Sequence, residues 1–519
     1  MKDRSNDNEK FYARFIPKPH MTRKQHQQAI WEDDFDDDDD EDETEDDYEI
    51  VGDEEIVFDH PKKQSAKPAG HSSVSRPVDV RCPVSKKCSG CQMQNLTYQD
   101  GLHWKQAQVV KLLGQYGRVQ SIIGMENPTH YRNKVQVAFG MTRQHKIISG
   151  VWQSKEHKIT VVDRCMIEDS IASEIAITVR KLLSAFKMTA WTEQEGGFLR
   201  HLLIRRGFAT GQIMVVLVAG TPVFPSKKNF VAALLRAHPE ITTVVFTVNG
   251  SDTNLLLGDR EEVLYGKGYI EDMLCGLTFR ISPKSFYQVN PVQTEVLYRT
   301  AIDFAGLTGN ETVLDAYCGI GTIGLAAASE ARRVIGVELN ADAVADAQKN
   351  KRQNGIQNAS FICADAGEYL TSVAEQQQNG QKIDVLFMDP PRAGASREFL
   401  NAVLRCVPEK IVYISCNPET QARDLKQLAG GRQPAYRVKK IQPVDMFPWT
   451  HHVENIVLLE RSVPKKEDTH QNKHIQSSDH KQAQPKPKSV HRSRPSRRSQ
   501  FADRNRAVFG KSGKKSEKK

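Results

Sequence analysis

The chain has 519 residues and a formal net charge of +8, enough length for two or three domains and a balance that favours a polyanionic partner. No apolar stretch reaches the roughly 18 residues of a membrane span, and the N-terminus lacks a signal-peptide core, so we expect no membrane partner. Nine cysteines, an odd number, do not fit a secreted disulfide framework and predict a reducing, cytoplasmic location.

Both ends of the chain have compositions that disfavour folding. Residues 32–55 hold eighteen Asp and Glu and no Lys or Arg, whereas seventeen Lys and Arg face five acids from Pro464 onward. Such segments repel themselves and have too few apolar side chains to form a core. We therefore predict a disordered, acidic segment and linker at residues 1–79 and a disordered basic tail at residues 463–519.

Four cysteines precede the main predicted domain. They lie in C-P-V-S-K-K-C-S-G-C and in V-V-D-R-C, at Cys82, Cys88, Cys91 and Cys165. Four thiolates suit zinc or an iron–sulfur cluster. Zinc sites usually pair two short knuckles, whereas this set has one tight pair, so the spacing favours iron–sulfur ligation. Because four cysteines leave no open iron, we interpret the cluster as structural or RNA-organising; four unrelated buried thiols are the alternative.

An α+β region is predicted between the cysteine loop and residue 280. Apolar strands are expected at residues 135–140, 201–207 and 212–218, and a helix near 170–186. The region also holds cationic side chains that can contact phosphates or bases, namely Arg132, Lys134, Arg200 and His201. As ordinary surface charges these residues would need no explanation.

A glycine-rich turn marks the second predicted domain. Residues 312–325, T-V-L-D-A-Y-C-G-I-G-T-I-G-L, combine an apolar strand, the pattern G-x-G-x-x-G at Gly319, Gly321 and Gly324, and helix-forming residues. Glu338 ends the next strand, where a carboxylate can accept hydrogen bonds from ribose hydroxyls. So far NAD and S-adenosylmethionine fit equally well.

Three aspartates separate these two cofactors. Asp315 lies just before the glycines, where its charge opposes a pyrophosphate but suits the positive end of S-adenosylmethionine. Asp365 follows a third strand and can accept from an adenine amino group, and Asp389 in D-P-P-R ends a fourth strand. Alternating strands and helices from about 312 to 461 predict a doubly wound parallel sheet of the α/β class. These features favour a methyltransferase over a dehydrogenase.

A cysteine ends the next apolar strand, in Y-I-S-C-N-P-E-T at residues 413–420. Asn417 and Pro418 stop the strand, so Cys416 is presented at a strand-to-loop corner where a thiolate can reach a ligand. Buried packing is the common fate of a single cysteine. A nucleophilic thiol beside a nucleotide site, however, indicates covalent chemistry on a substrate that needs activation.

Taken together, these motifs resemble the RNA uracil-C5 methyltransferases: the iron–sulfur-containing group that acts on 23S ribosomal RNA, and its relatives that modify transfer RNA. The similarity covers about residues 80–461. Besides the motifs above, it includes Y-R-N-K (131–134), L-R-H (199–201), S-F-Y-Q-V-N (285–290) and H-V-E (452–454). The resemblance implies a Rossmann-like class I methyltransferase domain at 281–462, preceded by a cluster loop and an RNA-binding region at 80–280.

The resemblance also implies roles for individual residues. A [4Fe–4S] cluster would be held by Cys82, Cys88, Cys91 and Cys165. S-adenosylmethionine would be contacted by Gln288, Tyr317, Thr322, Glu338, Asp365 and Asp389. Cys416 would be the nucleophile and Glu454 the base.

This chemistry has a physical reason. C5 of uracil is a poor nucleophile, but addition of a thiolate to C6 places electron density on C5, and a base must afterwards remove the C5 proton. The target base must first leave its stack, and aromatic side chains help to hold such bases. Candidates for that task are Phe286, Tyr287, Phe447 and Trp449.

We therefore predict a monomeric enzyme that makes 5-methyluridine in RNA, with ribosomal RNA as the preferred substrate and no DNA partner. Within the class, the alternative is a transfer-RNA enzyme with the same mechanism. From other classes, an RNA-binding or assembly factor without catalysis and a nicotinamide oxidoreductase remain, although the latter leaves Cys416 unexplained.

One departure from the family pattern concerns the region before Cys82. Members that act on ribosomal RNA often begin with a small β-barrel, and no run of alternating strands precedes Cys82. The cationic tail is a hypothetical replacement for the lost non-specific RNA affinity.

Overall fold

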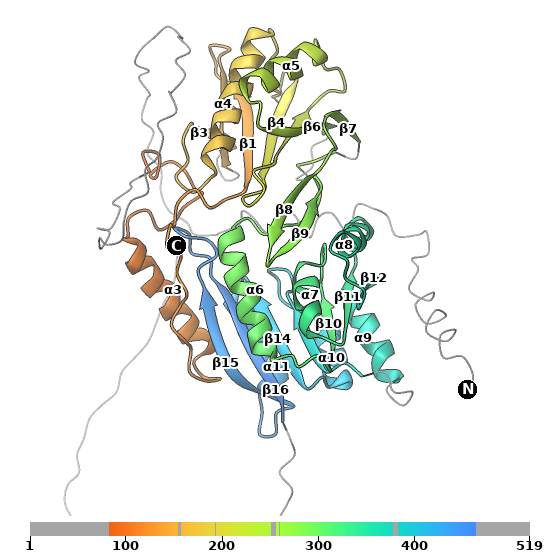
Figure 1. Ribbon diagram of the computed structural model, residues 1–519. Helices are drawn as coiled ribbons and strands as arrows, with labels where there is room; N and C mark the ends of the chain where they lie inside the picture. Colours follow the sequence, from red (N-terminus) through yellow and green to blue (C-terminus); the bar gives the residue numbers. More distant parts are fainter. Residues whose placement is uncertain are drawn as a thin grey trace, which may run out of the picture. The chain divides into compact units, whose positions relative to one another are not determined.

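The computed structural model describes residues 82–153, 157–192, 194–250, 256–258, 260–376 and 382–462 (Figure 1). The predicted acidic segment, the region where a β-barrel would stand and the cationic tail lie outside the described residues. Within the described part of the chain, no helix is long and apolar enough to cross a membrane.

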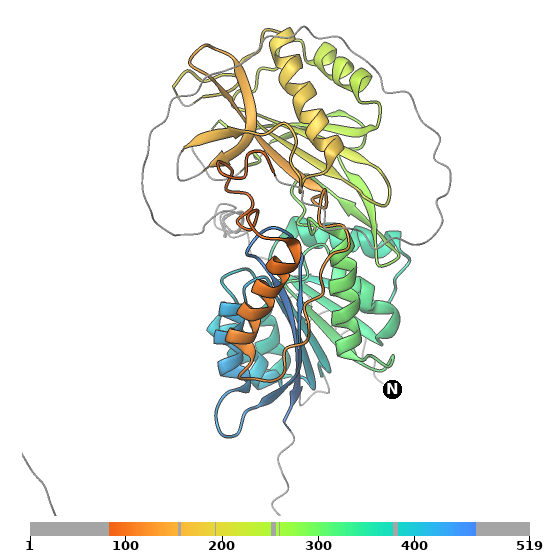
Figure 2. The ribbon, with the colours of Figure 1, turned by 90° about the vertical axis from the view of Figure 1, so that its left-hand side faces the viewer.

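The first sheet has seven strands in the order β3-β2-β1-β4-β5-β6-β7. Their bounds are β1 (Lys134–Met141), β2 (Ile147–Gln153), β3 (Lys158–Val161), β4 (Leu199–Arg206), β5 (Ile213–Ala219), β6 (Ile241–Val248) and β7 (Glu261–Tyr265). Helices α4 (Ser170–Ala185) and α5 (Lys227–Ala237) lie on one face of this sheet (Figures 1 and 2). The three predicted strands and the predicted helix are confirmed.

The side chains of β4 alternate between the two faces of the first sheet. Leu202 and Ile204 pack in the core under α4 and α5, whereas Leu203 belongs to a core shared with the rest of the molecule. Because successive residues of a strand point to opposite faces, Arg205 shares the face of Leu203. The first sheet therefore has one face closed by its own helices and one face turned to the second domain.

The second sheet also has seven strands, in the order β12-β11-β10-β13-β14-β16-β15. Their bounds are β10 (Thr312–Ala316), β11 (Arg333–Glu338), β12 (Ala359–Cys363), β13 (Val385–Met388), β14 (Lys410–Ser415), β15 (Tyr436–Val444) and β16 (Glu454–Arg461). The strand order reverses at β10, which is flanked by β11 and β13. At such a switch point, open α/β sheets bind their ligands.

The second sheet is mixed, so the expectation of a parallel sheet throughout residues 312–461 was wrong at its end. The strands from β10 to β14 are parallel, whereas β16 pairs antiparallel with both β14 and β15. No helix is assigned between β15 and β16. Without a crossover helix the chain can only turn back beside its own strand, which gives an antiparallel pair. The Rossmann-like α/β class itself is confirmed.

Helices cover both faces of the second sheet (Figure 1). Helices α6 (Pro291–Ala305), α7 (Thr322–Ala327) and α8 (Ala341–Gln353) share one core. The opposite face carries α3 (Tyr98–Leu113), α9 (Ala366–Glu375), α10 (Arg397–Cys406) and α11 (Pro418–Ala429). A short 3-10 helix (Ala328–Glu330) follows α7, and a hairpin of β8 (Ile270–Leu274) and β9 (Leu277–Ile281) precedes α6.

Helix α3 precedes the first sheet in the sequence but packs on the second. Its residues Val109 and Leu113 are fully buried in the core with α11 and β15. Lys105 forms a buried ion pair of 2.6 Å with Asp445, in the segment after β15, and its Nζ also donates to the Phe447 carbonyl at 2.9 Å. This contact ties the first described helix, α3, to the loop that leads to Glu454.

We expect Lys105→Met to destabilise the protein by about 3–5 kcal/mol, because it leaves the Asp445 carboxylate buried without its cation. The measurement is denaturant unfolding at neutral pH. Lys111→Met on the exposed side of the same helix is the matched control. If Lys105→Met lowered the free energy of unfolding by less than about 1 kcal/mol, the apolar contacts of α3 alone would account for its attachment to the second sheet.

Candidate active site

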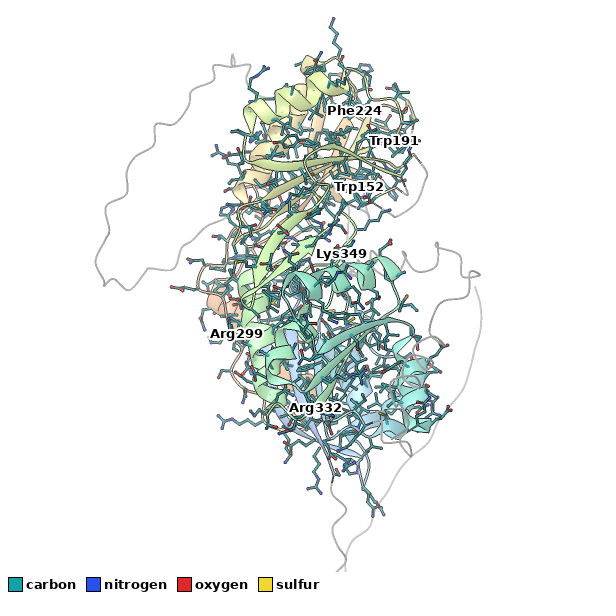
Figure 3. The ribbon with its side chains drawn as sticks, turned by 45° about the vertical axis from the view of Figure 1, so that its right-hand side comes forward. Trp152, Trp191, Phe224, Arg299, Arg332 and Lys349 are labelled. Carbon is teal, nitrogen blue, oxygen red and sulfur yellow. The ribbon has the colours of Figure 1, made fainter. Side chains whose placement is uncertain are left out.

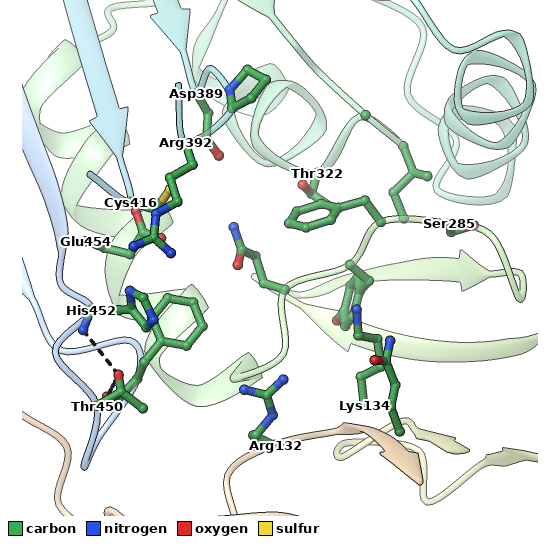
Figure 4. Close-up of a pocket in the computed structure, with 18 of the residues that line it drawn as sticks. Arg132, Lys134, Ser285, Thr322, Asp389, Arg392, Cys416, Thr450, His452 and Glu454 are labelled. Atoms are coloured by element: carbon green, nitrogen blue, oxygen red, sulfur yellow. Dashed lines mark hydrogen bonds between the residues drawn. The ribbon is translucent and has the colours of Figure 1, made fainter. Parts of the chain in front are cut away.

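One large cavity of about 730 Å³ lies between the carboxyl edge of the second sheet and the cysteine loop (Figure 4). All twelve residues that the sequence assigned to catalysis, cofactor or cluster line it: Cys82, Cys88, Cys91, Cys165, Gln288, Tyr317, Thr322, Glu338, Asp365, Asp389, Cys416 and Glu454. The fold therefore brings together side chains that are spread over more than 370 positions of sequence. Their individual roles remain predictions.

Cys416 and Glu454 lie opposite each other across two neighbouring strands. Strands β14 and β16 pair antiparallel up to Ser415 and Asn455, and the next position outward in this register faces Cys416 with Glu454. Figure 4 shows the two side chains beside each other, with Asp389 from the end of β13 nearby. A thiol and a carboxyl group thus converge on one point of the cavity wall.

The carboxyl group of Glu454 is buried in a way that favours its protonated form. The residue is 3% exposed, and its Oε2 has no hydrogen-bond partner among the described residues. Burial, together with the nearby charge of Asp389, raises the pKa of Glu454 well above its usual range. Burial likewise raises the pKa of Asp389 to about 7. Burial thus shifts both carboxyl groups toward their protonated forms.

The glycine turn forms an acidic corner next to this pair. The N–H of Gly319 donates to Glu338 at 3.1 Å, and the N–H of Gly324 donates to Asp315 at 2.9 Å. A Cβ on Gly324 would stand 2.8 Å from the Asp315 carboxylate, so only glycine fits there. Burial raises the pKa of Asp315 to about 7, with the nearby charges of Asp389 and Glu338 adding to the effect. A ligand with a positive charge would relieve this repulsion.

A loop between β9 and α6 forms the facing wall of the cavity. Within this loop, Gln288 is nearly buried, whereas the ring of Phe286 is 55% exposed and borders the cavity. Asn133 of the first domain holds the loop through hydrogen bonds to the carbonyls of Gln288 and Val289. The loop is thus fixed from the first domain while its side chains face the second.

Four basic side chains lie in the cavity wall, namely Arg132, Lys134, Arg392 and His452. Figure 4 shows Arg392 and His452 beside Cys416 and Glu454, whereas Arg132 and Lys134 lie apart from that pair. Arg392 and His452 belong to the motifs D-P-P-R and H-V-E, but no role was predicted for them from the sequence. The alternation of an extended segment could have found His452, because residues two apart share a face and Glu454 is two positions further on.

Three other residues predicted to contact RNA have mainly structural surroundings. Arg200 lies 4.3 Å above the ring of Trp191, a residue labelled in Figure 3. Neither Arg200 nor His201 lines the cavity. Burial lowers the pKa of His201 to about 4, so it is neutral at physiological pH. Trp449 is buried and donates to the Pro128 carbonyl, which corrects the expectation that it holds a base.

Tyr287 borders the cavity but is buried, and its hydroxyl reaches Asp272 at 3.4 Å. Of the four predicted aromatic residues, Phe286 and Phe447 remain as side chains that can face a base in the cavity.

The four cysteines gather at the far wall of the cavity. Cys82, Cys91 and Cys165 pack against the same small apolar group around Tyr131 and Trp449, and none of the nine cysteines, all of which lie in the described part of the chain, forms a disulfide. Burial raises the pKa of Cys91 to about 12 and that of Cys165 further, so without a cation these thiols are protonated. Among the described residues no group of three ligands has the geometry of a metal site. The four thiols share one location and have the donor chemistry of a cluster, but in this structure they are not arranged as a metal site.

An acidic corner beside a glycine turn selects a cationic nucleotide ligand, which places the protein among the S-adenosylmethionine-dependent methyltransferases. The profile of the tRNA (Uracil-5-)-methyltransferase family matches residues 97–462. The chain belongs to this family and is an RNA uracil-C5 methyltransferase.

Individual relatives agree with this assignment. An uncharacterized RNA methyltransferase of Halalkalibacterium halodurans is 42% identical over 389 residues, which cover 74% of this chain and 83% of the relative. One from Staphylococcus aureus is 40% identical over 384 residues, covering 73% and 83%. The crystal structure of Pyrococcus abyssi tRNA (uracil-54, C5)-methyltransferase in complex with S-adenosyl-L-homocysteine has a TM-score of 0.60 and 30% identity, covering 72% of this chain and 86% of that chain. The predicted family and enzyme class are confirmed.

Proposed function

We propose that this enzyme methylates C5 of a uridine in ribosomal RNA through a covalent bond between Cys416 and C6 of the uracil ring. The observation that carries the proposal is the register of β14 and β16, which sets Cys416 opposite Glu454 in the cavity that also contains the glycine turn. A nucleophile and a base held beside each other at one point of the cavity wall can serve addition and elimination on the same ring.

The first step is addition of the Cys416 thiolate to C6, which moves the electron pair of the C5–C6 double bond onto C5 and the neighbouring carbonyl oxygen. C5 then takes the methyl group by in-line displacement from the sulfonium, and S-adenosylhomocysteine leaves. S-adenosylmethionine supplies the activated methyl group when bound. Gln288, Tyr317, Thr322, Glu338, Asp365 and Asp389 are the residues that we propose to hold it.

The second step is removal of the C5 proton by Glu454, after which the electron pair re-forms the double bond and expels the Cys416 thiolate. Glu454 must be ionised to act, although burial favours its protonated form. The positive charge of the bound sulfonium would lower the pKa of the neighbouring carboxyl groups and thereby prepare the base. One proton is released for each methyl group transferred.

RNA with 5-fluorouridine at the target position tests this chemistry, because fluorine on C5 cannot leave as a proton and the adduct accumulates. Denaturing electrophoresis should show one stable protein–RNA species that depends on S-adenosylmethionine. A protein that binds the RNA but forms no such species would instead be an RNA-binding or assembly factor without catalysis.

The RNA substrate is tested by mapping 5-methyluridine in cells that lack the protein. We expect a single class of position to be lost from the large ribosomal RNA. Loss from transfer RNA would select the second candidate, which is favoured by the description of the matching family and by the Pyrococcus abyssi enzyme.

We also propose that Cys82, Cys88, Cys91 and Cys165 hold a [4Fe–4S] cluster with a structural role. Support comes from their position in one wall and from the raised pKa values of buried thiols, which a cationic iron centre would reverse. The nine cysteines, all described and none in a disulfide, also fit the proposed reducing compartment.

Cys165→Ala should therefore lower the iron and sulfide content of anaerobically purified protein from about four atoms each to near zero. Absorbance near the iron–sulfur charge-transfer bands measures the same loss. Cys363→Ala, outside the cavity, is the control. Full iron content in Cys165→Ala would remove this residue from the ligand set.

A further inference from the structure

Arg205 is a buried cation in the apolar strand β4, and neither the family motifs nor the cavity gave it a role. It is 5% exposed, and no carboxylate of the described residues lies within ion-pair distance. Its direct partner across the strand pair is Lys134, a second buried cation on the same face. Burial lowers the pKa of Arg205 to about 10. Two neighbouring buried cations destabilise a sheet, so their contacts elsewhere must explain the arrangement.

The guanidinium group of Arg205 contacts the loop between β9 and α6. Its Nη2 donates to the carbonyl of Ser285 at 2.6 Å and to that of Pro283 at 3.3 Å. A planar group with several fixed donors can hold two carbonyls of one turn, which a lysine cannot do with the same geometry. Arg205 thus fixes the backbone of this loop from the side of the first sheet.

Asp346 of α8 holds the same loop from the opposite side. Its Oδ2 accepts hydrogen bonds from the hydroxyls of Ser282 and Ser285, both at 3.0 Å. Lys349, one turn further along α8 and labelled in Figure 3, pairs with the other carboxylate oxygen at 2.9 Å. The loop is therefore clamped between the first sheet and a helix of the methyltransferase domain.

The clamped loop carries two side chains of the cavity. Ser285 is followed directly by Phe286, whose ring is exposed to the cavity, and then by Gln288. A shift of about 1 Å in the backbone at Ser285 would move both side chains relative to the glycine turn, and misplacement of this size is costly for catalysis.

We propose that Arg205 is a positioning residue that sets the loop at residues 282–290, so that Gln288 meets the cofactor and Phe286 faces the target base. This inference rests on the proposed function for its assignment of Gln288 and Phe286. Through Arg205 the cofactor wall is held by the same sheet face whose Lys134 also lines the cavity. The first domain therefore acts on cofactor binding as well as on RNA.

The test is calorimetric titration of full-length Arg205→Met and Arg205→Lys with S-adenosylhomocysteine, together with steady-state methylation. We expect Arg205→Met to weaken binding tenfold or more, a difference of about 1.4 kcal/mol, and to raise the KM for S-adenosylmethionine by a similar factor. Arg205→Lys should recover part of the affinity, because an ammonium can still reach one carbonyl.

The matched control is Arg206→Met. Arg206 is the next residue of β4, and its side chain pairs with Asp169 on the face that carries α4. It also loses a charge and an ion pair, but we expect its affinity for S-adenosylhomocysteine to stay within twofold of the unchanged protein. Equal weakening in both variants would attribute the effect to general loss of stability and overturn the proposal.

A second variant keeps the proposal testable if Arg205→Met does not fold. Asp346→Ala releases the same loop from the other side and should give the same loss of affinity. Unchanged affinity in a folded Arg205→Met, or in Asp346→Ala, would overturn the proposal. The titration needs no RNA, so a protein that binds the cofactor product normally but makes no 5-methyluridine would contradict the proposed function while leaving the clamp testable.

Discussion

Cys416→Ala is expected to abolish methyl transfer, with turnover falling by more than about 10³-fold, as loss of a catalytic nucleophile usually does. The reason is that C5 of uracil gains its nucleophilic character only while C6 carries the thiolate. The measurement is transfer of labelled methyl groups into RNA, combined with the 5-fluorouridine adduct, which should disappear in the same variant.

Binding separates this effect from damage to the fold. Cys416 lies at the end of β14 and is partly exposed, so its replacement should leave the unfolding temperature and the affinity for S-adenosylhomocysteine unchanged. Cys275→Ala, outside the cavity, is the matched control and should keep full activity. Turnover within tenfold of normal in Cys416→Ala would exclude covalent catalysis by this thiol.

Glu454→Gln is expected to lower turnover by about 10²–10⁴-fold, and to do so after the methyl group has moved. The amide cannot accept the C5 proton, so the methylated ring should stay bonded to Cys416. Mass spectrometry of the denatured complex with unmodified RNA would detect this species. Glu460→Gln, on the same strand but paired at the surface with Lys439, should behave normally.

The pH dependence of this step follows from the burial of Glu454. A base works only when deprotonated, and its pKa is raised, so the rate of product release should increase with pH up to that raised pKa. Asp389→Asn removes the neighbouring negative charge and should move the rise to lower pH. If neither Glu454→Gln nor Asp389→Asn changed the pH profile of product release, another group would have to accept the proton.

The sequence was sufficient to predict site residues where a reactive side chain stands at the end of an apolar strand. Cys416, Asp389 and Glu338 each follow an apolar run, and parallel strands deliver such residues to one edge of a sheet. The same logic could not predict the antiparallel end of the sheet, because only the missing crossover helix decides it. Nor could it place α3, whose amphipathic pattern fits any apolar surface.

The roles of other side chains could not be predicted from the sequence, because tertiary contacts determine those roles. Arg205 reads as one of two charges at the end of a strand, and only the packing of the first sheet against residues 283–285 shows that it is buried. Trp449 and Phe447 are equivalent in sequence, yet one fills a core and the other borders the cavity. Burial separates these roles, and periodicity does not report it for irregular segments.

Strand β16, which begins with Glu454, is hydrogen-bonded on both sides, to β14 and to β15. A strand held this way has little freedom to move toward its substrate, so the RNA must change its conformation on binding. Uridines that already stand outside a duplex have less stacking energy to give up and are the easier targets. The enzyme's selectivity among uridines should thus depend on how readily each nucleotide flips out of its stack, as well as on the neighbouring nucleotide sequence.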